Sequence, residues 1–218
     1  MTLSGKAASL KDRLLERPQV YTFVQAATQL TGMSALRALF RDVVDDRPYD
    51  SVLELGCGTG LWPVTRYRRF LRTDVNDRYF PATPPAGMEF RLVDATDLSP
   101  LSGESFDLVY SFGLYHHLPD ASVSASLREA ARVLRPGGRM LAFDAIWPTR
   151  RFNLLGRALR RLDRGGFVRT QEALLTLIRS TGTTVLGVRG CRWGPALEGC
   201  FVEMQPAAAA VEASGQGG

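Results

Sequence analysis

The sequence predicts an α/β fold in which a doubly wound parallel sheet carries helices on both faces. First, residues 48–146 alternate short apolar runs with helical or loop segments, as expected where right-handed crossovers join parallel strands. Second, a glycine-rich turn follows the first of these runs, at the carboxyl edge where such sheets bind ligands. The chain of 218 residues is long enough for one such domain with small additions.

Residues 1–47 are predicted to form a helical segment ahead of the sheet. Apolar residues recur at helical spacing in three stretches: Pro18 begins the second, Gly32 ends it, and Arg47-Pro48 follows the third. This segment either packs on the sheet or folds over the binding site as a lid that excludes water. The sequence leaves both readings open.

The central motif is the stretch Ser51-Val-Leu-Glu54-Leu-Gly56-Cys57-Gly58-Thr59-Gly60. Its apolar first half predicts a buried strand. The three glycines let the chain turn sharply, so that backbone N–H groups can approach a ligand that a Cβ would exclude. Pro63 suits the first turn of a helix whose N-terminus faces that ligand. A dinucleotide-binding turn would place its third glycine one residue later.

Further motifs follow this stretch in a fixed order. They are an acid at the end of Leu71-Arg72-Thr73-Asp74, the run Phe90 to Ala95 with Asp94, the run Phe106 to Ser111, and Glu129 to Arg139 with its Pro-Gly-Gly turn. Together the five motifs, over residues 49–205, resemble class I S-adenosylmethionine-dependent methyltransferases, in particular the small-molecule branch of the type 11 group. The resemblance implies a Rossmann-like, seven-stranded sheet that is mostly parallel, with the last strand antiparallel.

The same resemblance implies S-adenosyl-L-methionine as the cofactor and S-adenosyl-L-homocysteine as the product. It assigns Asp74 to the ribose hydroxyls and Asp94 to the adenine amino group. The other residues that we place in the cofactor site are Glu54, Gly56, Cys57, Gly58, Gly60, Val75, Ala95, Ser111 and Phe112. Between Asp74 and Phe90 the chain is short and proline-rich, so the helix that the family carries there is expected to be reduced.

The methyl acceptor is expected beside the end of the fourth strand. His116 and His117 are the only histidines of the chain and stand there together. Either they have a structural role, or one of them removes a proton from the acceptor, since imidazole titrates near neutrality. Tyr115 and Asp144, at the ends of the fourth and fifth strands, are predicted to contact the acceptor. Asp144 could instead cap the next turn.

Residues 147–168 interleave six arginines with apolar residues and predict a basic amphipathic helix inserted on the substrate side. One interpretation is an arginine face in contact with solvent. The other is that Arg160 and Arg161 bind a carboxylate, a phosphate or an acidic carrier protein. Thr170 is then predicted to cap a helix that Gly182 ends. Two last strands, 184–188 and 199–205, complete the predicted cofactor-binding domain of residues 48–206, and a disordered tail, 207–218, is expected after it.

Composition narrows the function further. The net charge is +5, but 25 of the 27 basic residues are arginine (27 − 2 lysines), which indicates compositional bias and disfavours nucleic acid as partner. We expect no membrane span, no metal site and a cytoplasmic location. The prediction is methyl transfer to an O, N or C atom of a small, acidic or carrier-bound molecule. The alternatives are an RNA or protein methyltransferase and a non-catalytic cofactor-binding protein, and the oligomeric state is left open.

Overall fold

The computed structural model describes residues 33–60, 62–161, 165–193 and 196–206. The predictions for residues 1–32, including most of the possible lid, and for the tail 207–218 therefore lie outside the described residues. The described elements are α3 (Met33–Val43), β1 (Tyr49–Leu55), β2 (Tyr67–Asp74), η1 (Asp77–Tyr79), β3 (Met88–Leu92), β4 (Phe106–Phe112), η2 (Tyr115–His117), α4 (Asp120–Val133), β5 (Leu134–Ile146), α5 (Leu154–Arg161), α6 (Gln171–Ser180), β6 (Thr183–Trp193) and β7 (Leu197–Pro206).

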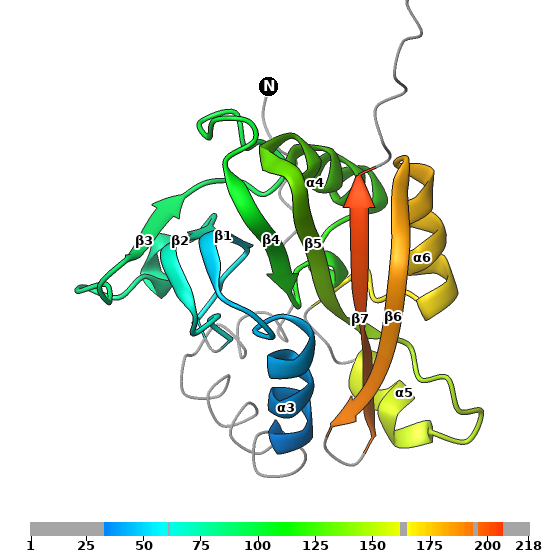
Figure 1. The fold of residues 1–218 in the computed structure, drawn as a ribbon. Coiled ribbons are helices and arrows are strands. Elements are labelled where there is room, and N and C mark those ends of the chain that lie inside the picture. Colours follow the sequence, from blue (N-terminus) through cyan, green and yellow to red (C-terminus); the bar gives the residue numbers. More distant parts are fainter. Residues whose placement is uncertain (1–32, 61, 162–164, 194–195, 207–218) are drawn as a thin grey trace, which may run out of the picture.

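The strands form one seven-stranded sheet in the order β3-β2-β1-β4-β5-β7-β6 (Figure 1). The five strands from β3 to β5 pair in parallel, whereas β7 runs antiparallel to both β5 and β6. The predicted fold class is confirmed. The strand order reverses between β1 and β4, and in open α/β sheets ligands bind outside the carboxyl ends of the strands at such a point.

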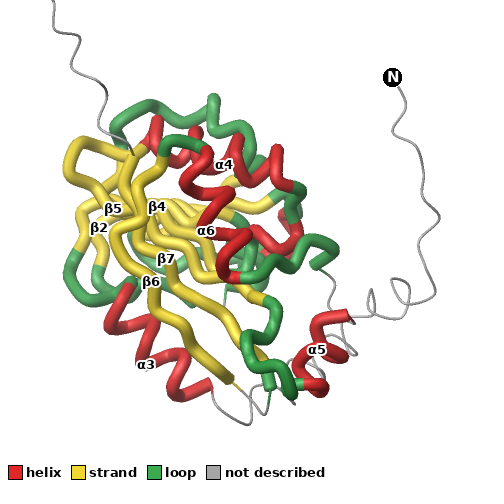
Figure 2. Tube along the Cα trace, turned by 90° about the vertical axis from the view of Figure 1, so that its right-hand side faces the viewer, coloured by secondary structure: helices red, strands yellow, loops and turns green. Residues whose placement is uncertain are grey.

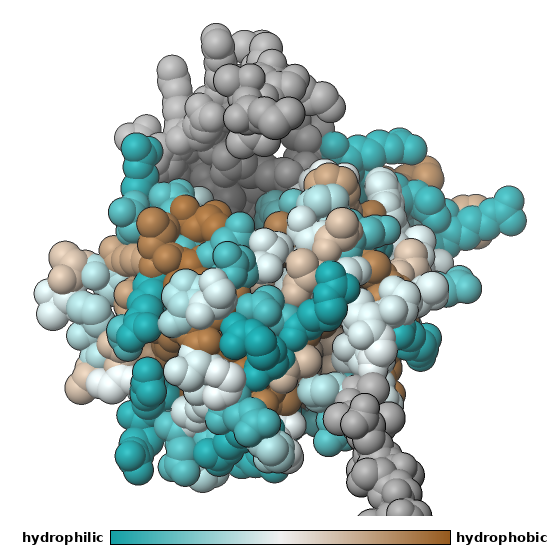
Figure 3. All heavy atoms as spheres, turned by 90° about the horizontal axis from the view of Figure 1, so that it is seen from above, coloured by the Kyte–Doolittle hydropathy of each residue, from teal (hydrophilic) through white to brown (hydrophobic). Residues whose placement is uncertain are grey.

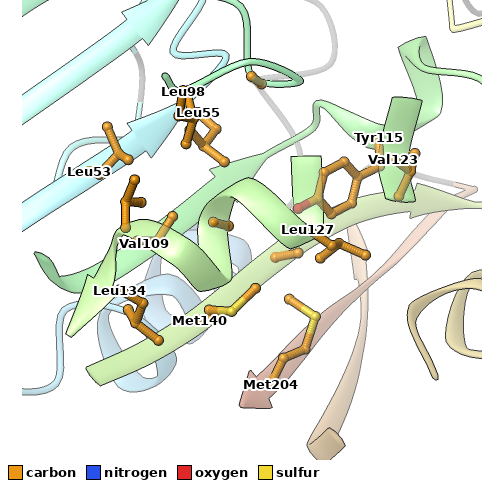
Figure 4. Packing of buried hydrophobic residues seen from close by; sticks show 14 of the residues in the cluster. Leu53, Leu55, Leu98, Val109, Tyr115, Val123, Leu127, Leu134, Met140 and Met204 are labelled. Carbon is orange, nitrogen blue, oxygen red and sulfur yellow. The ribbon is translucent and has the colours of Figure 1, made fainter. Parts of the chain in front are cut away.

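Helices cover both faces of this sheet. Helices α4 and α6 pack on one face, and α3 packs on the other (Figures 1 and 2). Successive residues of β1 and β4 therefore bury alternately in two cores, which explains why both strands read as continuous apolar runs. Leu53 and Val109 lie in the core on the α4 side, shown in Figure 4, whereas Val52 and Leu108 lie in the core under α3.

Several boundaries differ from the predicted ones. Strands β6 and β7 extend beyond 184–188 and 199–205, because they form a long antiparallel pair from Thr183↔Pro206 to Trp193↔Leu197. Strand β5 begins before its predicted start, and the residues between Leu134 and Arg139 form an irregularity in its pairing with β4. The predicted cap of α6 is confirmed, since the Thr170 side chain accepts a hydrogen bond from the Ala173 N–H.

The helix predicted after the glycine stretch is wrong. Among the described residues between Leu55 and Tyr67 there is no helix. Gly56, Gly58 and Gly60 have φ of +66°, +49° and +75°, a region that a right-handed helix does not use. The few residues left before β2 pack on the sheet instead.

Trp62 and Val64 make the contacts that replace this helix. The Trp62 ring stacks on Phe112 with ring centroids 4.4 Å apart, and the Trp62 carbonyl accepts a hydrogen bond of 3.0 Å from the Tyr110 hydroxyl. Val64 is buried in the core under α3. The helix expected between Asp74 and Phe90 is reduced, as predicted, to the single turn η1.

Candidate cofactor and acceptor site

The glycine loop lies against the end of β4. A Cβ on Gly56 would lie 2.7 Å from Cδ1 of Leu114, and a Cβ on Gly60 would lie 2.9 Å from Nη1 of Arg72. Both positions also have positive φ, so the backbone conformation favours glycine there, and the neighbouring side chains would have to shift for any other residue. The loop therefore joins the predicted cofactor motif to the segment that carries the two histidines.

Asp74 ties this loop to the end of β2. Its Oδ2 accepts a hydrogen bond of 2.8 Å from the Gly58 N–H, and its Oδ1 accepts one of 3.0 Å from the Asn76 N–H. Beside it, Val75 is 69% exposed although it is apolar.

Asp94 is exposed near the end of β3, where its Oδ1 accepts 2.8 Å hydrogen bonds from the N–H and hydroxyl of Thr96; the adjacent Ala95 is buried.

Glu54 forms a buried ion pair with Arg72. Glu54 was predicted as a site residue from the sequence, but Arg72 was not. The two residues face each other in the β1–β2 register, and Arg72 Nε lies 2.6 Å from Glu54 Oε2, with side chains 4% and 2% exposed. Burial raises the pKa of Glu54 to about 7, although the Arg72 charge opposes this rise. Nη1 of Arg72 also donates to the Gly60 carbonyl at 3.3 Å, so the pair braces the glycine loop.

Three other predicted site residues are occupied in packing. Cys57 is buried, and burial raises the pKa of its thiol to about 12, so it acts as a small apolar side chain and not as a nucleophile. Ser111 is buried within β4. The Phe112 ring lies between Trp62 and Phe143, with centroid distances of 4.4 and 4.3 Å.

Tyr115 was predicted to contact the acceptor, but the structure places it in the core on the α4 side. It is buried beside Val123 and Leu127 (Figure 4), and this burial raises the pKa of its hydroxyl to about 12. The residue after a strand end can turn either toward the sheet edge or back under the helix. Here the turn η2 directs Tyr115 back under α4.

His116 and Asp144 form a hydrogen-bonded pair at the carboxyl ends of β4 and β5. His116 Nδ1 lies 2.5 Å from Asp144 Oδ1, and Asp144 is 2% exposed. The same Oδ1 accepts a 2.8 Å hydrogen bond from the Ala145 N–H. Since Nδ1 of the neutral ring donates to the carboxylate, Nε2 is the atom that can accept a proton. The His117 ring packs on the His116 ring at a centroid distance of 4.1 Å.

Residues 165–169 hold the histidine turn from outside, and sequence reasoning missed them. A Cβ on Gly165 would lie 2.6 Å from the His116 carbonyl oxygen and would overlap the imidazole ring. The Phe167 N–H donates to the same carbonyl at 3.0 Å. Arg169 donates to the carbonyls of Tyr115 and Leu118 at 2.8 Å each. The signal in the sequence that could have indicated this contact is the pair Gly165-Gly166. Only Gly165 lies so close to His116 that a side chain would not fit.

In the region 147–168, where a basic helix was predicted, the described residues form the short helix α5, and the arginines divide between buried and exposed positions. Arg160 is buried, and its guanidinium donates to the carbonyls of Ile146 (3.2 Å) and Glu198 (2.7 Å) and lies over the Trp193 ring. The Arg161 side chain is exposed. Arg160 therefore anchors the helix to the end of β5 and the start of β7, because the carbonyls there need donors.

The remaining predictions for this part of the chain concern metals and membranes. Within the described ranges, no group of three or more His, Cys, Asp or Glu side chains is placed to hold a metal ion. No helix in the part of the chain that the structure describes has the length and apolar character needed to cross a membrane.

A cavity of about 740 Å³ lies at the opposite edge of the sheet, where the strands begin. It is lined by Tyr49, Asp107 and four arginines, Arg47, Arg66, Arg68 and Arg135, among others. Seen from the end at which β4 and β5 begin, the surface is mostly hydrophilic (Figure 3). None of the predicted site residues lines this cavity, so it is separate from the carboxyl edge.

Part of the chain is similar to known methyltransferases. Residues 53–142 match the methyltransferase domain family. The 27-O-demethylrifamycin SV methyltransferase of Amycolatopsis mediterranei is 34% identical over 144 residues, which are 57% of this chain and 47% of that protein. The ubiquinone biosynthesis O-methyltransferase of Hahella chejuensis is 27% identical over 196 residues, 79% of this chain and 80% of that protein.

The fold agrees with this match. The N-methyltransferase NodS of Bradyrhizobium japonicum WM9, solved with S-adenosyl-L-homocysteine, superposes with a TM-score of 0.63 at 16% identity, over 80% of this chain and 87% of that one. The match to the methyltransferase domain family covers residues 53–142, and the solved N-methyltransferase shares the fold over most of the chain. The match to this domain family supports the predicted cofactor, S-adenosyl-L-methionine. The chain spans about half the length of the rifamycin relative, so the comparison covers only part of that protein.

Proposed function

We propose that this methyltransferase transfers the methyl group of S-adenosyl-L-methionine to a hydroxyl oxygen of a small molecule, with His116 as the general base. The sequence left oxygen, nitrogen and carbon acceptors open. The hydrogen-bonded pair of His116 and Asp144 favours oxygen, because a hydroxyl must lose its proton to become a good nucleophile, whereas a neutral amine need not. Two relatives carry names of O-methyl chemistry, which supports the same reading.

The residues at the carboxyl edge fit the cofactor. Asp74 offers the ribose a carboxylate at the end of β2, and the exposed Val75 beside it offers the adenine an apolar surface. The glycine loop has the positive φ values that leave its backbone accessible to a ligand. Asp94 can accept a hydrogen bond from the adenine amino group. Glu54 acts here through its ion pair with Arg72, which fixes the loop.

The bound cofactor supplies an electrophilic methyl group on a sulfonium, whose sulfur takes the bonding electron pair on transfer. The chain then has to align the acceptor and take its proton. Asp144 holds the His116 ring in the tautomer with Nε2 as proton acceptor, and it stabilises the imidazolium once the proton arrives. His117 packs against that ring and limits its rotation. We therefore assign His116 the base role and His117 a positioning role.

Calorimetric titration with S-adenosyl-L-methionine and S-adenosyl-L-homocysteine tests the cofactor half of the proposal. Micromolar or tighter binding is expected for wild type, and Asp74→Ala should weaken it about tenfold or more, because two ribose hydrogen bonds are lost. Glu172→Ala, at an exposed acid on α6, is the control and should bind like wild type. No binding of either ligand would contradict the proposal.

The base role is tested by release of S-adenosyl-L-homocysteine over a panel of phenols, alcohols and amines. With an accepted hydroxyl compound, His116→Ala should lose about 100-fold or more in kcat and keep its cofactor affinity. His117→Ala should lose less. Equal rates for wild type and His116→Ala, or methylation of amines alone, would refute His116 as base.

A further inference from the structure

We infer that the surface formed by Arg150, Arg151, Phe152, Leu154 and Leu155, here called the α5 patch, docks on an anionic lipid bilayer. Three large apolar side chains of this patch point to solvent: Phe152 is 87%, Leu154 71% and Leu155 53% exposed. Both arginines are exposed as well. This inference goes beyond methyl transfer and does not depend on it.

The exposure of the patch is enforced by the contacts beneath it. Glu198, which is buried, accepts hydrogen bonds on Oε2 from the N–H (3.0 Å) and hydroxyl (2.7 Å) of Thr149 and on Oε1 from the Asn153 amide (3.0 Å). Gly156 is buried against the Ala196 carbonyl, where no Cβ would fit. Helix α5 thus turns Gly156 and Arg160 inward, and Leu154 and Leu155 lie on its exposed side.

The sequence segment that carries the patch is basic. Residues 147–161 contain five arginines and no acidic residue: Arg150, Arg151, Arg157, Arg160 and Arg161. The Arg151 guanidinium lies over the Phe152 ring at 5.9 Å. Exposed apolar side chains flanked by arginines are the composition of segments that lie in a membrane interface, where the apolar groups enter the acyl boundary and the cations pair with anionic headgroups.

The α5 patch lies near the proposed acceptor site, so docking on a bilayer would affect how an acceptor reaches that site. Helix α5 follows β5, whose end carries Asp144, and it lies at the carboxyl edge of the sheet (Figures 1 and 2). A bilayer under the α5 patch would therefore face the edge that holds the acceptor site. An apolar acceptor dissolved in the membrane would reach that edge without crossing water.

Sedimentation with lipid vesicles tests this inference on the full chain. Wild type should bind vesicles of phosphatidylcholine with about one third phosphatidylglycerol and should bind pure phosphatidylcholine vesicles far less. Binding should also fall as salt is raised. The variant Phe152→Ser/Leu155→Ser should lower the partition coefficient about tenfold or more, because it removes two apolar side chains that enter the bilayer. Arg150→Glu/Arg151→Glu should lower it similarly.

Leu186→Ser is the matched control, because Leu186 is another exposed apolar residue, 56% exposed on β6 and outside the patch. It should bind like wild type, and circular dichroism confirms that each variant is folded. Two results would overturn the inference: no binding of wild type to the anionic vesicles, or equal binding by the patch variants and Leu186→Ser. Either result would favour a protein partner for the patch, and neither bears on cofactor affinity.

Discussion

Replacing Arg72 by methionine should make the stability of the protein depend on pH above neutrality. Arg72→Met removes the cation that faces Glu54 and leaves a buried carboxyl between β1 and β2. Methionine fills most of the space of the arginine stem, so the main loss is electrostatic. The carboxyl then avoids an unpaired buried charge by keeping its proton to higher pH.

The size of the effect follows from the pKa of Glu54. Burial raises this pKa from 4.5 to about 7 with Arg72 present. A carboxyl with a higher pKa in the folded state favours folding at low pH. This stabilising contribution is fully present below pH 4.5 and is lost as the pH rises from 4.5 to 7. Above pH 7 the stability of wild type no longer depends on the titration of Glu54. In Arg72→Met the folded pKa lies above 7, so the loss continues. Relative to wild type, the variant should then lose further stability, on the order of 1 kcal/mol for each pH unit above 7, until the pH reaches this higher pKa.

Urea denaturation of wild type and variant at pH 7, 8 and 9 measures this difference in the free energy of unfolding. The double variant Glu54→Gln/Arg72→Met has no ionisable group at this place, so its deficit against wild type should not change over the same range. If the difference in the free energy of unfolding between wild type and Arg72→Met were also independent of pH, the reasoning would be refuted. It would mean that Glu54 is ionised in the fold without its partner.

Three further perturbations test other contacts. Gly165→Ala should displace the His116 ring and lower kcat about 100-fold, whereas Gly166→Ala, where a Cβ meets nothing within 4 Å, should leave kcat near wild type. Thr170→Ala should lower the free energy of unfolding by about 1 kcal/mol in urea denaturation, because the Ala173 N–H loses its acceptor. Asp144→Asn should lower kcat without changing the affinity for S-adenosyl-L-homocysteine in calorimetry, because the His116 tautomer is no longer fixed.

The sheet and the cofactor edge could be predicted from sequence because their signals are local. A parallel strand buried on both faces is a continuous apolar run, and the glycine turn and the acid at the end of β2 follow their strands directly. Leu53 and Asp74 could therefore be placed without knowledge of their neighbours. The contact of Asp74 with Gly58 follows from the pairing of β1 with β2, which the fold class already implies.

The contacts that failed to appear in the prediction join residues far apart in sequence. Arg72 meets Glu54, and Gly165 meets His116, only once β1, β2, β4 and the segment before α6 are assembled. The helix expected after the glycine stretch failed for a related reason. The family pattern predicts a helix there, but Trp62 and Val64 gain more by packing on Phe112 and the core under α3 than a short helix interrupted by glycine and proline could gain.

The orientation of α5 follows from contacts that periodicity does not encode. Spacing identifies which residues share a face of a helix, and Gly156 and Arg160, four residues apart, do share one. It does not say which face lies inside. That choice was made by groups in other elements: the carbonyls of Ile146 and Glu198, which need donors, and the Ala196 carbonyl, which leaves room only for glycine. Because those groups bind arginine better than leucine, the apolar face of α5 remains in solvent, where its chemistry suits a partner and not a core.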